Sequence, residues 1–433
     1  MMIMRYGIFA AIALATAFSA PAQQWSLDSC ISYAQTHNIT VRQRALDYVS
    51  AGHDVTEAKD RFLPDVAATA SQSFNFGRGL TSANTYANRN TSNFQWGVGL
   101  NLPLFQGLSA VRQVGYAKAS LRAVLEDLEA AKDDVTLNVM AGYLQVLYCD
   151  EIHKVAVGQE NLSLMELERR RALLDAGKIP EIDMLEAESQ LAQDRLAVVT
   201  ALNDRTMALV DLAQLLRLDY VEGFDVEPLA DEMPILMSAD EVYANATDHN
   251  HALAAGRQRI AAADKYVGVA EAGYIPRLSF NAGLGSSYYT VNGYDNLRFG
   301  RQMRDNFNTY LGFSLNIPIF DAFSTRNSVR KAKVRKLAAE LNYESACDDL
   351  YKTIRKAVVE ASNALKKHEA AEIAERATHE AMLAMREKYN LGRATPTEFE
   401  TAKTNYMKAV SQRLQSKYEY LLRCRILAFY NRH

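Results

Sequence analysis

The sequence predicts a mainly α-helical chain with a membrane β-barrel portion and an internal tandem duplication. Three observations predict this fold class. Only nine of the 433 residues are proline, whereas average usage is about 5%, so long helices can run without interruption. Four short segments alternate between apolar and polar residues, which is typical of strands that have one apolar face. Both halves of the chain repeat the same motifs in the same order.

Residues 1–22 have the pattern of a secretory signal peptide. Arg5 precedes an apolar run over 6–18 that is too short to cross a bilayer, and Ala20-Pro21-Ala22 forms a cleavage site of the small-x-small type. An uncleaved N-terminal anchor is the alternative. We therefore expect the mature chain to begin at Gln23 and to work outside the cytoplasm.

Short motifs recur at an offset of 212 to 215 residues, which indicates a tandem duplication. Leu100-Asn101-Leu102-Pro103-Leu104-Phe105 recurs as Leu315-Asn316-Ile317-Pro318-Ile319-Phe320. Leu63-Pro64 recurs as Ile275-Pro276, and Gly177 recurs as Gly392. The predicted division is a signal peptide over 1–22, a first structural repeat over 23–218, a linker over 219–240 and a second repeat over 241–433.

Each repeat is expected to contain a first helix, two strands, a very long helix, a glycine-containing turn and a return helix. The helices are predicted at 26–61, 109–176, 181–217, 239–272, 321–391 and 397–431. The segment 321–391 holds neither glycine nor proline, and apolar residues recur every three or four positions, as in coiled coils. Gly177 and Gly392 suit left-handed helix C-caps, and Pro180 and Pro396 suit the first turn of a returning helix.

Strands are predicted at 66–76, 93–104, 278–284 and 311–319. The apolar faces of the second and fourth contain Phe94, Trp96, Val98 and Leu100, and Leu311, Phe313, Leu315 and Ile317, respectively. Such strands either bury one face in a soluble sandwich or turn it to lipid in a transmembrane barrel. Long helices separate the strands and leave no second sheet, which favours the barrel. Since about eight strands are the minimum for closure, several copies of the chain must combine.

Composition and motifs argue against several other classes of function. A net charge of −3 argues against nucleic-acid binding. His368-Glu369 lacks the second histidine of a zinc site, and Gly97-Val98-Gly99 lacks the third glycine of a dinucleotide site. We therefore predict no enzyme activity, no metal and no cofactor. The cysteines fall in helical patterns, which favours free buried thiols over disulfides: Cys30, Cys149, Cys347 and Cys424.

The charged run Glu166-Leu167-Glu168-Arg169-Arg170-Arg171 lies inside the first long helix. Charged runs of this kind usually cover the solvated face of a helix. We therefore expect its side chains to face water.

Taken together, the motifs resemble the TolC family of outer-membrane efflux proteins, also called outer membrane factors. The resemblance rests on the order and spacing of the duplicated Leu-Asn-Leu/Ile-Pro-Leu/Ile-Phe motif, of Arg61-Phe62-Leu63-Pro64 and Gly273-Tyr274-Ile275-Pro276, and of the two glycine turns. It implies a homotrimer in which a 12-stranded β-barrel in the outer membrane of a Gram-negative cell continues as a 12-helix α-barrel across the periplasm. It also implies a passive export duct that contacts outer-membrane lipid, a periplasmic membrane-fusion adaptor and an inner-membrane pump of the RND or ABC type.

The same resemblance assigns roles to the two turns. The adaptor would dock at Gly177 and Lys178 in the first turn and at Gly392 and Arg393 in the second.

Acids beyond the turns would form the periplasmic gate. Asp183 matches an acid of the network that holds the family's mouth shut, and Glu398 matches the first of two acids that ring the closed lumen. Thr401 stands at the position of the second acid. Ala394 stands at the position of a basic gate residue, and the neighbouring Arg393 is the candidate to replace that base. Without the resemblance, Glu398 is simply an acid in a helix's first turn, where the helix dipole favours it.

Two other functions stay open from the sequence, namely a periplasmic coiled-coil adaptor and a structural or adhesive envelope protein. Adaptors usually carry one hairpin, whereas this chain has two equivalent ones. Within the duct hypothesis, type I protein secretion is the alternative to small-molecule efflux. The sequence does not define the transported substrate.

Overall fold

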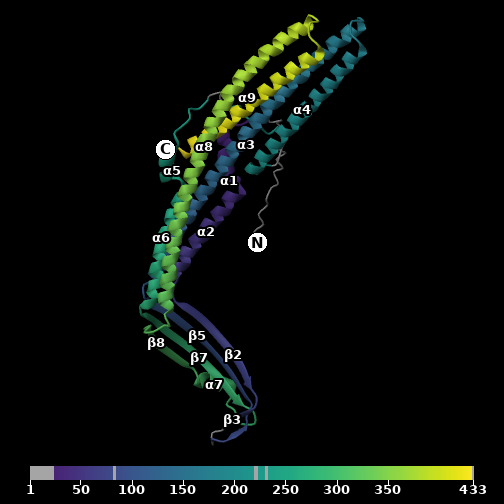
Figure 1. Cartoon of the computed structure of the whole chain (residues 1–433). Coiled ribbons are helices and arrows are strands. Elements are labelled where there is room, and N and C mark those ends of the chain that lie inside the picture. The colour runs from purple at the N-terminus through teal and green to yellow at the C-terminus, as the bar shows by residue number, and fades with distance from the viewer. Residues whose placement is uncertain (1–23, 81–83, 219–222, 230–232, 432–433) are drawn as a thin grey trace, which may run out of the picture. The chain divides into compact units, whose positions relative to one another are not determined.

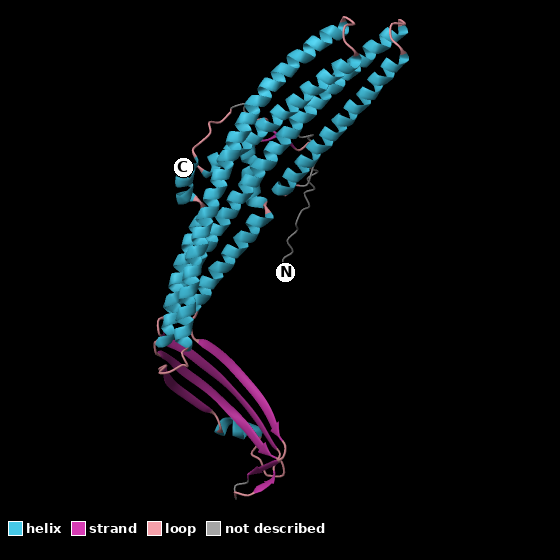
Figure 2. Ribbon diagram, viewed as in Figure 1, coloured by secondary structure: helices cyan, strands magenta, loops and turns pink. Residues whose placement is uncertain are grey.

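In the computed structural model, the described residues are 24–80, 84–218, 223–229 and 233–431. The predicted signal peptide and part of the predicted linker lie outside them. Helices dominate, and four long strands form one sheet (Figures 1 and 2). No helix of the described ranges is both long enough and apolar enough to cross a membrane.

The same series of elements occurs twice. The main elements of the first repeat are α1 (Leu27–His37), α2 (Ile39–Asp60), β2 (Asp65–Asn75), β5 (Thr91–Gln106), α3 (Ser109–Asp175) and α4 (Glu181–Leu216). Those of the second are α5 (Ala239–His249), α6 (His251–Glu271), β7 (Arg277–Val291), β8 (Asn308–Asn316), α8 (Ser324–Asn390) and α9 (Pro396–Tyr430). Shorter elements are β1 (Gln24–Trp25), β3 (Arg78–Leu80), β4 (Tyr86–Asn88), β6 (Asp225–Val226), η1 (Ala272–Tyr274) and α7 (Phe299–Asp305).

The chain forms two compact units, and each unit combines residues of both repeats. One unit holds residues up to 39, 133–238 and 356–429, and the other holds 40–132, 239–355 and 430 onward. We call the first the hairpin unit and the second the sheet unit. Both α3 and α8 contribute to each unit.

The first helix of each repeat is two helices, so the predictions of single helices over 26–61 and 239–272 are wrong. The breaks fall at Asn38 and Asn250, whose backbones are extended. The Asn250 side chain accepts a hydrogen bond from the Leu253 N–H at 3.0 Å, and the Asn38 amide donates to the Leu215 carbonyl at 3.0 Å. Asn250 thus competes locally for a backbone group and interrupts a helix whose apolar pattern continues. Asn38 instead ties the first break to α4.

In the sheet unit, β2, β5, β7 and β8 form an antiparallel sheet in that order. Its register places Val66, Leu100, Ala282 and Leu311 in one row across the sheet. Paired residues share a face, so the apolar faces predicted for the strands join into one continuous surface. Leu311 is 79% and Phe313 73% exposed in the isolated chain, whereas Phe94, Trp96, Val98 and Leu100 are half-buried.

The boundaries of β7 and β8 differ most from the prediction. Strand β8 begins at Asn308 and ends at Asn316, so Ile317 lies one residue beyond the strand that was expected to contain it. Pro318 follows, and proline has no N–H with which to extend the ladder. Strand β7 continues to Val291, past the predicted end at 284, because it pairs with β5 as far as Thr91.

Helix α7 covers part of the edge of β7 that β8 leaves unpaired. Strand β8 reaches only as far as Gly285 on β7. Further along, the Gln302 amide donates to the Tyr289 carbonyl and its oxygen accepts from the Tyr289 N–H, both at 3.0 Å. Asn306 donates to the Ser287 carbonyl at 2.7 Å. Side chains of α7 and its C-cap thus take the place of a strand, while β2 and β8 remain the outer edges of the sheet.

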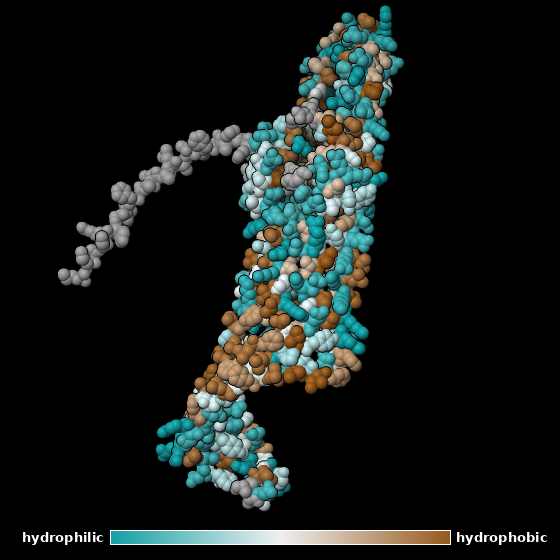
Figure 3. Space-filling view, turned by 90° about the vertical axis from the view of Figure 1, so that its left-hand side faces the viewer, coloured by the Kyte–Doolittle hydropathy of each residue, from teal (hydrophilic) through white to brown (hydrophobic). Residues whose placement is uncertain are grey.

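The sheet joins the long helices through the same backbone turn in both repeats. Gly107 and Leu108 have φ of 61° and 64°, and Ala322 and Phe323 have φ of 51° and 64°. A Cβ on Gly107 would lie 2.8 Å from the Ile275 Cβ, which explains glycine there. Apolar residues gather around this junction (Figure 3), and the exposed ones include Leu104, Phe105, Leu108, Ile319, Phe320 and Phe323.

The hairpin unit has its core between helices. Tyr143 of α3 is fully buried. Its hydroxyl donates to the Glu227 carbonyl at 2.6 Å and lies 3.1 Å from the Trp25 carbonyl. It thereby holds the parallel pair β1–β6 against α3. The four cysteines are free thiols: Cys30, Cys149, Cys347 and Cys424.

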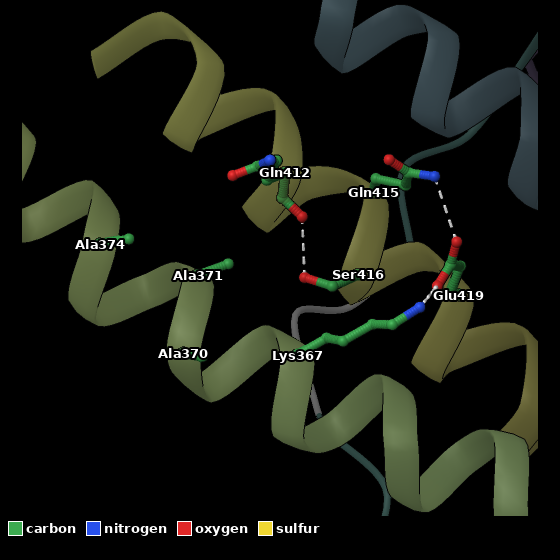
Figure 4. Close-up of a pocket in the computed structure, with 8 residues that line it drawn as sticks. All are labelled: Lys367, Ala370, Ala371, Ala374, Gln412, Gln415, Ser416 and Glu419. Atoms are coloured by element: carbon green, nitrogen blue, oxygen red, sulfur yellow. Dashed lines mark hydrogen bonds and ion pairs between the residues drawn. The ribbon is translucent and has the colours of Figure 1, made fainter. Parts of the chain in front are cut away.

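A groove of about 450 Å³ lies between α8 and α9 (Figure 4). Ala370, Ala371 and Ala374 leave this space on the α8 side. Polar side chains of α9 line the other wall, and Lys367 contacts Glu419 across it at 3.8 Å. Small residues on α8 thus keep part of this helix pair from packing fully.

Candidate functional site

The two hairpin turns have the same geometry. Gly177 and Gly392 both have φ of 68°. In the first turn, Lys178 N–H bonds to the Leu173 carbonyl at 2.9 Å and Gly177 N–H to the Leu174 carbonyl at 2.8 Å. The second turn repeats this pattern with Arg393 and Gly392. Each turn is therefore a Schellman C-cap, which requires a left-handed residue.

The four residues predicted to receive an adaptor are exposed at these turns. In the described part of the chain, the side chains of Lys178 and Arg393 make no hydrogen bond or ion pair. Arg393 therefore forms no gate contact with the described residues of its own chain.

Glu398 is bound to the start of its own helix. Its Oε2 accepts from the Thr395 N–H at 2.7 Å and from the Thr395 hydroxyl at 2.9 Å, while Thr395 Oγ1 accepts from the Glu398 N–H at 3.3 Å. This reciprocal pattern is a capping box. The Thr395 N–H and hydroxyl hold the pKa of the Glu398 carboxyl below its usual value. Glu398 thus has a local structural role at the start of α9, and its role in the gate stays a prediction.

Asp183 lies in the first turn of α4, and its backbone carbonyl rather than its carboxylate enters a polar cluster. The cluster is centred on Arg170 of α3, which is only 2% exposed. Arg170 donates from Nη1 to the Asp183 carbonyl at 2.7 Å and from Nε to Glu166 Oε1 at 3.0 Å. The expectation that this charged run is solvated is therefore wrong for Arg170, because three helices surround it.

Tyr389 of α8 completes this arrangement, which we call the Arg170 cluster: Glu166, Arg170, Tyr389 and the Asp183 carbonyl. The Tyr389 hydroxyl donates to Glu166 Oε1 at 2.7 Å and accepts from Arg170 Nε at 3.2 Å. Its ring stacks on Phe399 of α9 at 5.4 Å. Burial raises the pKa of Tyr389, and Glu166 adds to the shift. The cluster therefore joins the first hairpin, α3–α4, to the second, α8–α9.

Sequence reasoning missed Arg170 and Tyr389. Arg170 stands seven residues before Gly177, and Tyr389 stands three before Gly392. The spacing places both near the turns, but nothing local shows that an arginine in a charged run is buried. No group of three or more histidine, cysteine, aspartate or glutamate side chains in the described ranges is arranged to hold a metal ion.

A sheet with two unpaired edges and two long helical hairpins defines the fold of outer-membrane channel subunits. The Campylobacter jejuni CmeC outer membrane channel has this fold, with a TM-score of 0.75 at 17% identity over 94% of this chain and 85% of CmeC. The open state of the Neisseria gonorrhoeae MtrE outer membrane channel matches with a TM-score of 0.72 at 18% identity, over 99% of this chain and 97% of MtrE.

The profile of the outer membrane efflux protein family matches residues 30–216 and again 242–428, and the chain belongs to this family. The chain is 22% identical to Escherichia coli TolC over 94% of its own length and 82% of TolC. It is 25% identical to Brucella suis BepC, an outer membrane efflux protein, over 70% of its own length, and the match spans 62% of BepC.

The predicted resemblance and fold class are thereby confirmed. The four-stranded sheet does not close on itself, as expected for one subunit of a trimeric barrel.

Proposed function

We propose that this protein is the outer-membrane export duct of a tripartite efflux or secretion system and conducts substrates passively outward. The observation that carries the proposal is the open sheet. Its edges, β2 and β8, lack strand partners within the described chain. Unpaired backbone groups are too costly in lipid to remain open. Pairing of β2 with β8 of the next subunit satisfies both edges, and three copies of four strands give a twelve-stranded barrel.

The apolar surface of the sheet supports the same conclusion. We propose that Phe94, Trp96, Val98 and Leu100 of β5 and Leu311, Phe313 and Leu315 of β8 face the lipid. Ile317 then lies at the strand end, beside the exposed aromatic residues of the strand-to-helix junction. An apolar band bordered by aromatic residues is typical of outer-membrane barrels.

The hairpin turns would then lie at the periplasmic end. Their matched geometry offers an adaptor two similar sites, at Gly177 and Lys178 and at Gly392 and Arg393. We propose that the Arg170 cluster keeps the hairpins together in the closed channel. In this proposal Arg170, which belongs to the first hairpin, is the basic residue of the closed gate. Ala394 stands where the family has its basic gate residue, and Arg393 does not replace it.

The duct hypothesis requires assembly and conduction, and both can be measured. The full chain, expressed with its leader, should appear in the outer-membrane fraction as a trimer after detergent extraction. Purified trimers should give discrete conductance steps in planar lipid bilayers. Recovery of the chain as a soluble periplasmic monomer would contradict the proposal and favour the adaptor or envelope-protein alternatives.

The type of cargo requires a second experiment. Cells in which the chromosomal copy is deleted should accumulate a fluorescent efflux substrate if the partner is an RND pump. If they instead retain a secreted protein and accumulate no dye, the partner is an ABC exporter of type I secretion.

A further inference from the structure

A second polar cluster, separate from the turns, is buried between the two hairpins. Lys403 of α9 is 3% exposed and Asp194 of α4 is 7% exposed, and Ser163 of α3 is buried with them. Lysine and aspartate are almost never fully buried unless they are paired. The position of Lys403 therefore depends on what surrounds its ammonium group.

The ammonium group is held by residues of the other hairpin. Lys403 Nζ donates to Ser163 Oγ at 2.5 Å and lies 3.6 Å from Asp194 Oδ2. The Ser163 hydroxyl in turn donates to Asp194 Oδ2. Gln190 donates to Asp194 Oδ1 at 3.0 Å and Gln159 to Oδ2 at 3.4 Å. We call Lys403, Ser163 and Asp194 the Lys403 lock.

A second carboxylate leaves the lock with an excess of negative charge. Glu400 Oε2 lies 3.5 Å from Lys403 Nζ, but it makes no hydrogen bond. One cation thus faces two carboxylates, and only Asp194 has its remaining lone pairs satisfied. Removing the lysine from this site would leave Asp194 buried without a cation, which is far more costly than leaving the pair intact.

The lock lies at a different level from the Arg170 cluster. Ser163 precedes Arg170 by seven residues on α3, which corresponds to two helical turns or about 10 Å. Both clusters join α3 and α4 to the second hairpin. If the hairpins separate only at the turns, the Arg170 cluster breaks and the lock survives; if they separate further, the lock must break as well.

We propose that Lys403 is a positioning residue of the channel gate: its ammonium group holds α9 against α3 and α4 in the closed arrangement, and full opening requires loss of this pair. This inference rests on the proposed function as a duct. The lock should be either intact or fully broken. A partly separated ammonium–carboxylate pair loses its attraction and is not compensated by hydration until water reaches both groups.

The test uses the full-length trimer in planar bilayers. We expect Lys403→Met, which keeps most of the length of the side chain and removes its charge, to raise the mean conductance severalfold. Asp194→Asn, which preserves shape, should act in the same direction and serves if Lys403→Met does not assemble. Lys408→Met is the matched control, since Lys408 is exposed on the same helix, and it should leave conductance unchanged.

A charge-reversed pair separates a lock from ordinary packing. Lys403→Asp combined with Asp194→Lys restores opposite charges across the interface. Glu400→Gln is added in the same chain to prevent repulsion at the new carboxylate, and conductance should return toward that of Glu400→Gln alone. Failure of this rescue would assign the effect to lost packing and overturn the proposal. Wild-type conductance in both Lys403→Met and Asp194→Asn would also overturn it.

The two proposals fail in different ways. If wild-type trimers do not conduct under any condition, the duct hypothesis fails. If they conduct and Arg170→Met opens them while Lys403→Met does not, only the lock is refuted.

Discussion

The two hairpins share their backbone geometry and differ in the side chains that connect them. Their turns have the same φ at glycine and the same pair of C-cap hydrogen bonds. The charged residues at the centre of the two polar clusters, however, have no like-charged counterparts at a 215-residue offset. Arg170 corresponds to Met385, Asp194 to Ala409 and Lys403 to Glu188. Duplication has therefore kept the turns equal and made the facing surfaces complementary.

This difference separates two kinds of structural requirement. A turn needs a backbone conformation, which each copy provides for itself. The interface between the two hairpins instead pairs a base of one hairpin with an acid of the other, and these residues stand at positions that do not correspond in the two repeats. The Arg170 cluster and the Lys403 lock show how the copies diverged to join to each other.

Removing the base of the Arg170 cluster should give the largest effect. Arg170→Met leaves Glu166 with Arg169 as its remaining cation and removes the donor to the Asp183 carbonyl and the Tyr389 hydroxyl. Losing a hydrogen bond that involves a charged group costs about 1.5–3 kcal/mol. We expect a lower melting temperature of the trimer and a large rise in bilayer conductance. Arg171→Met, at the exposed neighbouring position, should change neither. Equal effects of both variants would mean that the cluster does not hold the hairpins together.

The equivalence of the two turns can be tested at their glycines. Gly177→Ala and Gly392→Ala each force a Cβ into left-handed backbone, at a cost of about 1–2 kcal/mol. Thermal unfolding should show similar losses for the two variants. Gly158→Ala, inside α3 with open space around it, should instead stabilise by about 0.5–1 kcal/mol. A clear difference between the two turn variants would show that one turn is supported by contacts that the other lacks.

The two roles of Glu398 predict different patterns of conductance. If three Glu398 carboxylates ring the lumen, Glu398→Ala should raise conductance and weaken block by multivalent cations, because repelling carboxylates attract cations. Thr395→Ala removes the capping partner but keeps the charge, so it should leave the block unchanged. If both variants behave alike, Glu398 acts through the helix start alone.

Acidic pH should favour the closed arrangement of the hairpins through protonation of Glu400, and this is the smallest of the expected effects on conductance. Burial raises the pKa of this carboxyl, which Lys403 and Arg170 partly oppose and Asp194 reinforces. The closed state therefore binds the proton more tightly than a state in which Glu400 meets water. The resulting stabilisation is complete below the ordinary pKa of 4.5, and it is lost as the pH rises through the raised pKa.

Mean conductance should accordingly increase from pH 4.5 toward neutrality, starting at the ordinary pKa of the carboxyl. Glu400→Gln mimics the protonated form and should flatten this profile. An unchanged pH profile in this variant would assign the titration to another group.

Much of the fold follows from the sequence because it depends on neighbouring residues. Glycine at 177 and 392 and proline at 103 and 318 restrict φ locally, and a period of two or of three to four residues shows which face of a segment is apolar. The long helices, the turns and the alternating strands could therefore be predicted. Even so, the helix breaks at Asn38 and Asn250 were not predicted, since the apolar pattern continues across them.

Only the tertiary structure decided which charged residues are buried. Arg170 and Lys403 lie in segments that look solvated along the chain. Each contacts a helix that is distant in sequence, through Tyr389 and Ser163, respectively. Burial of a charge depends on contacts between helices, and periodicity within one helix does not report those contacts. In the same way, only the packing of α7 against β7 shows how the sheet edge is covered beyond the end of β8. The sequence alone thus determined the repeated backbone, and the tertiary structure decided how the two copies of it are held together.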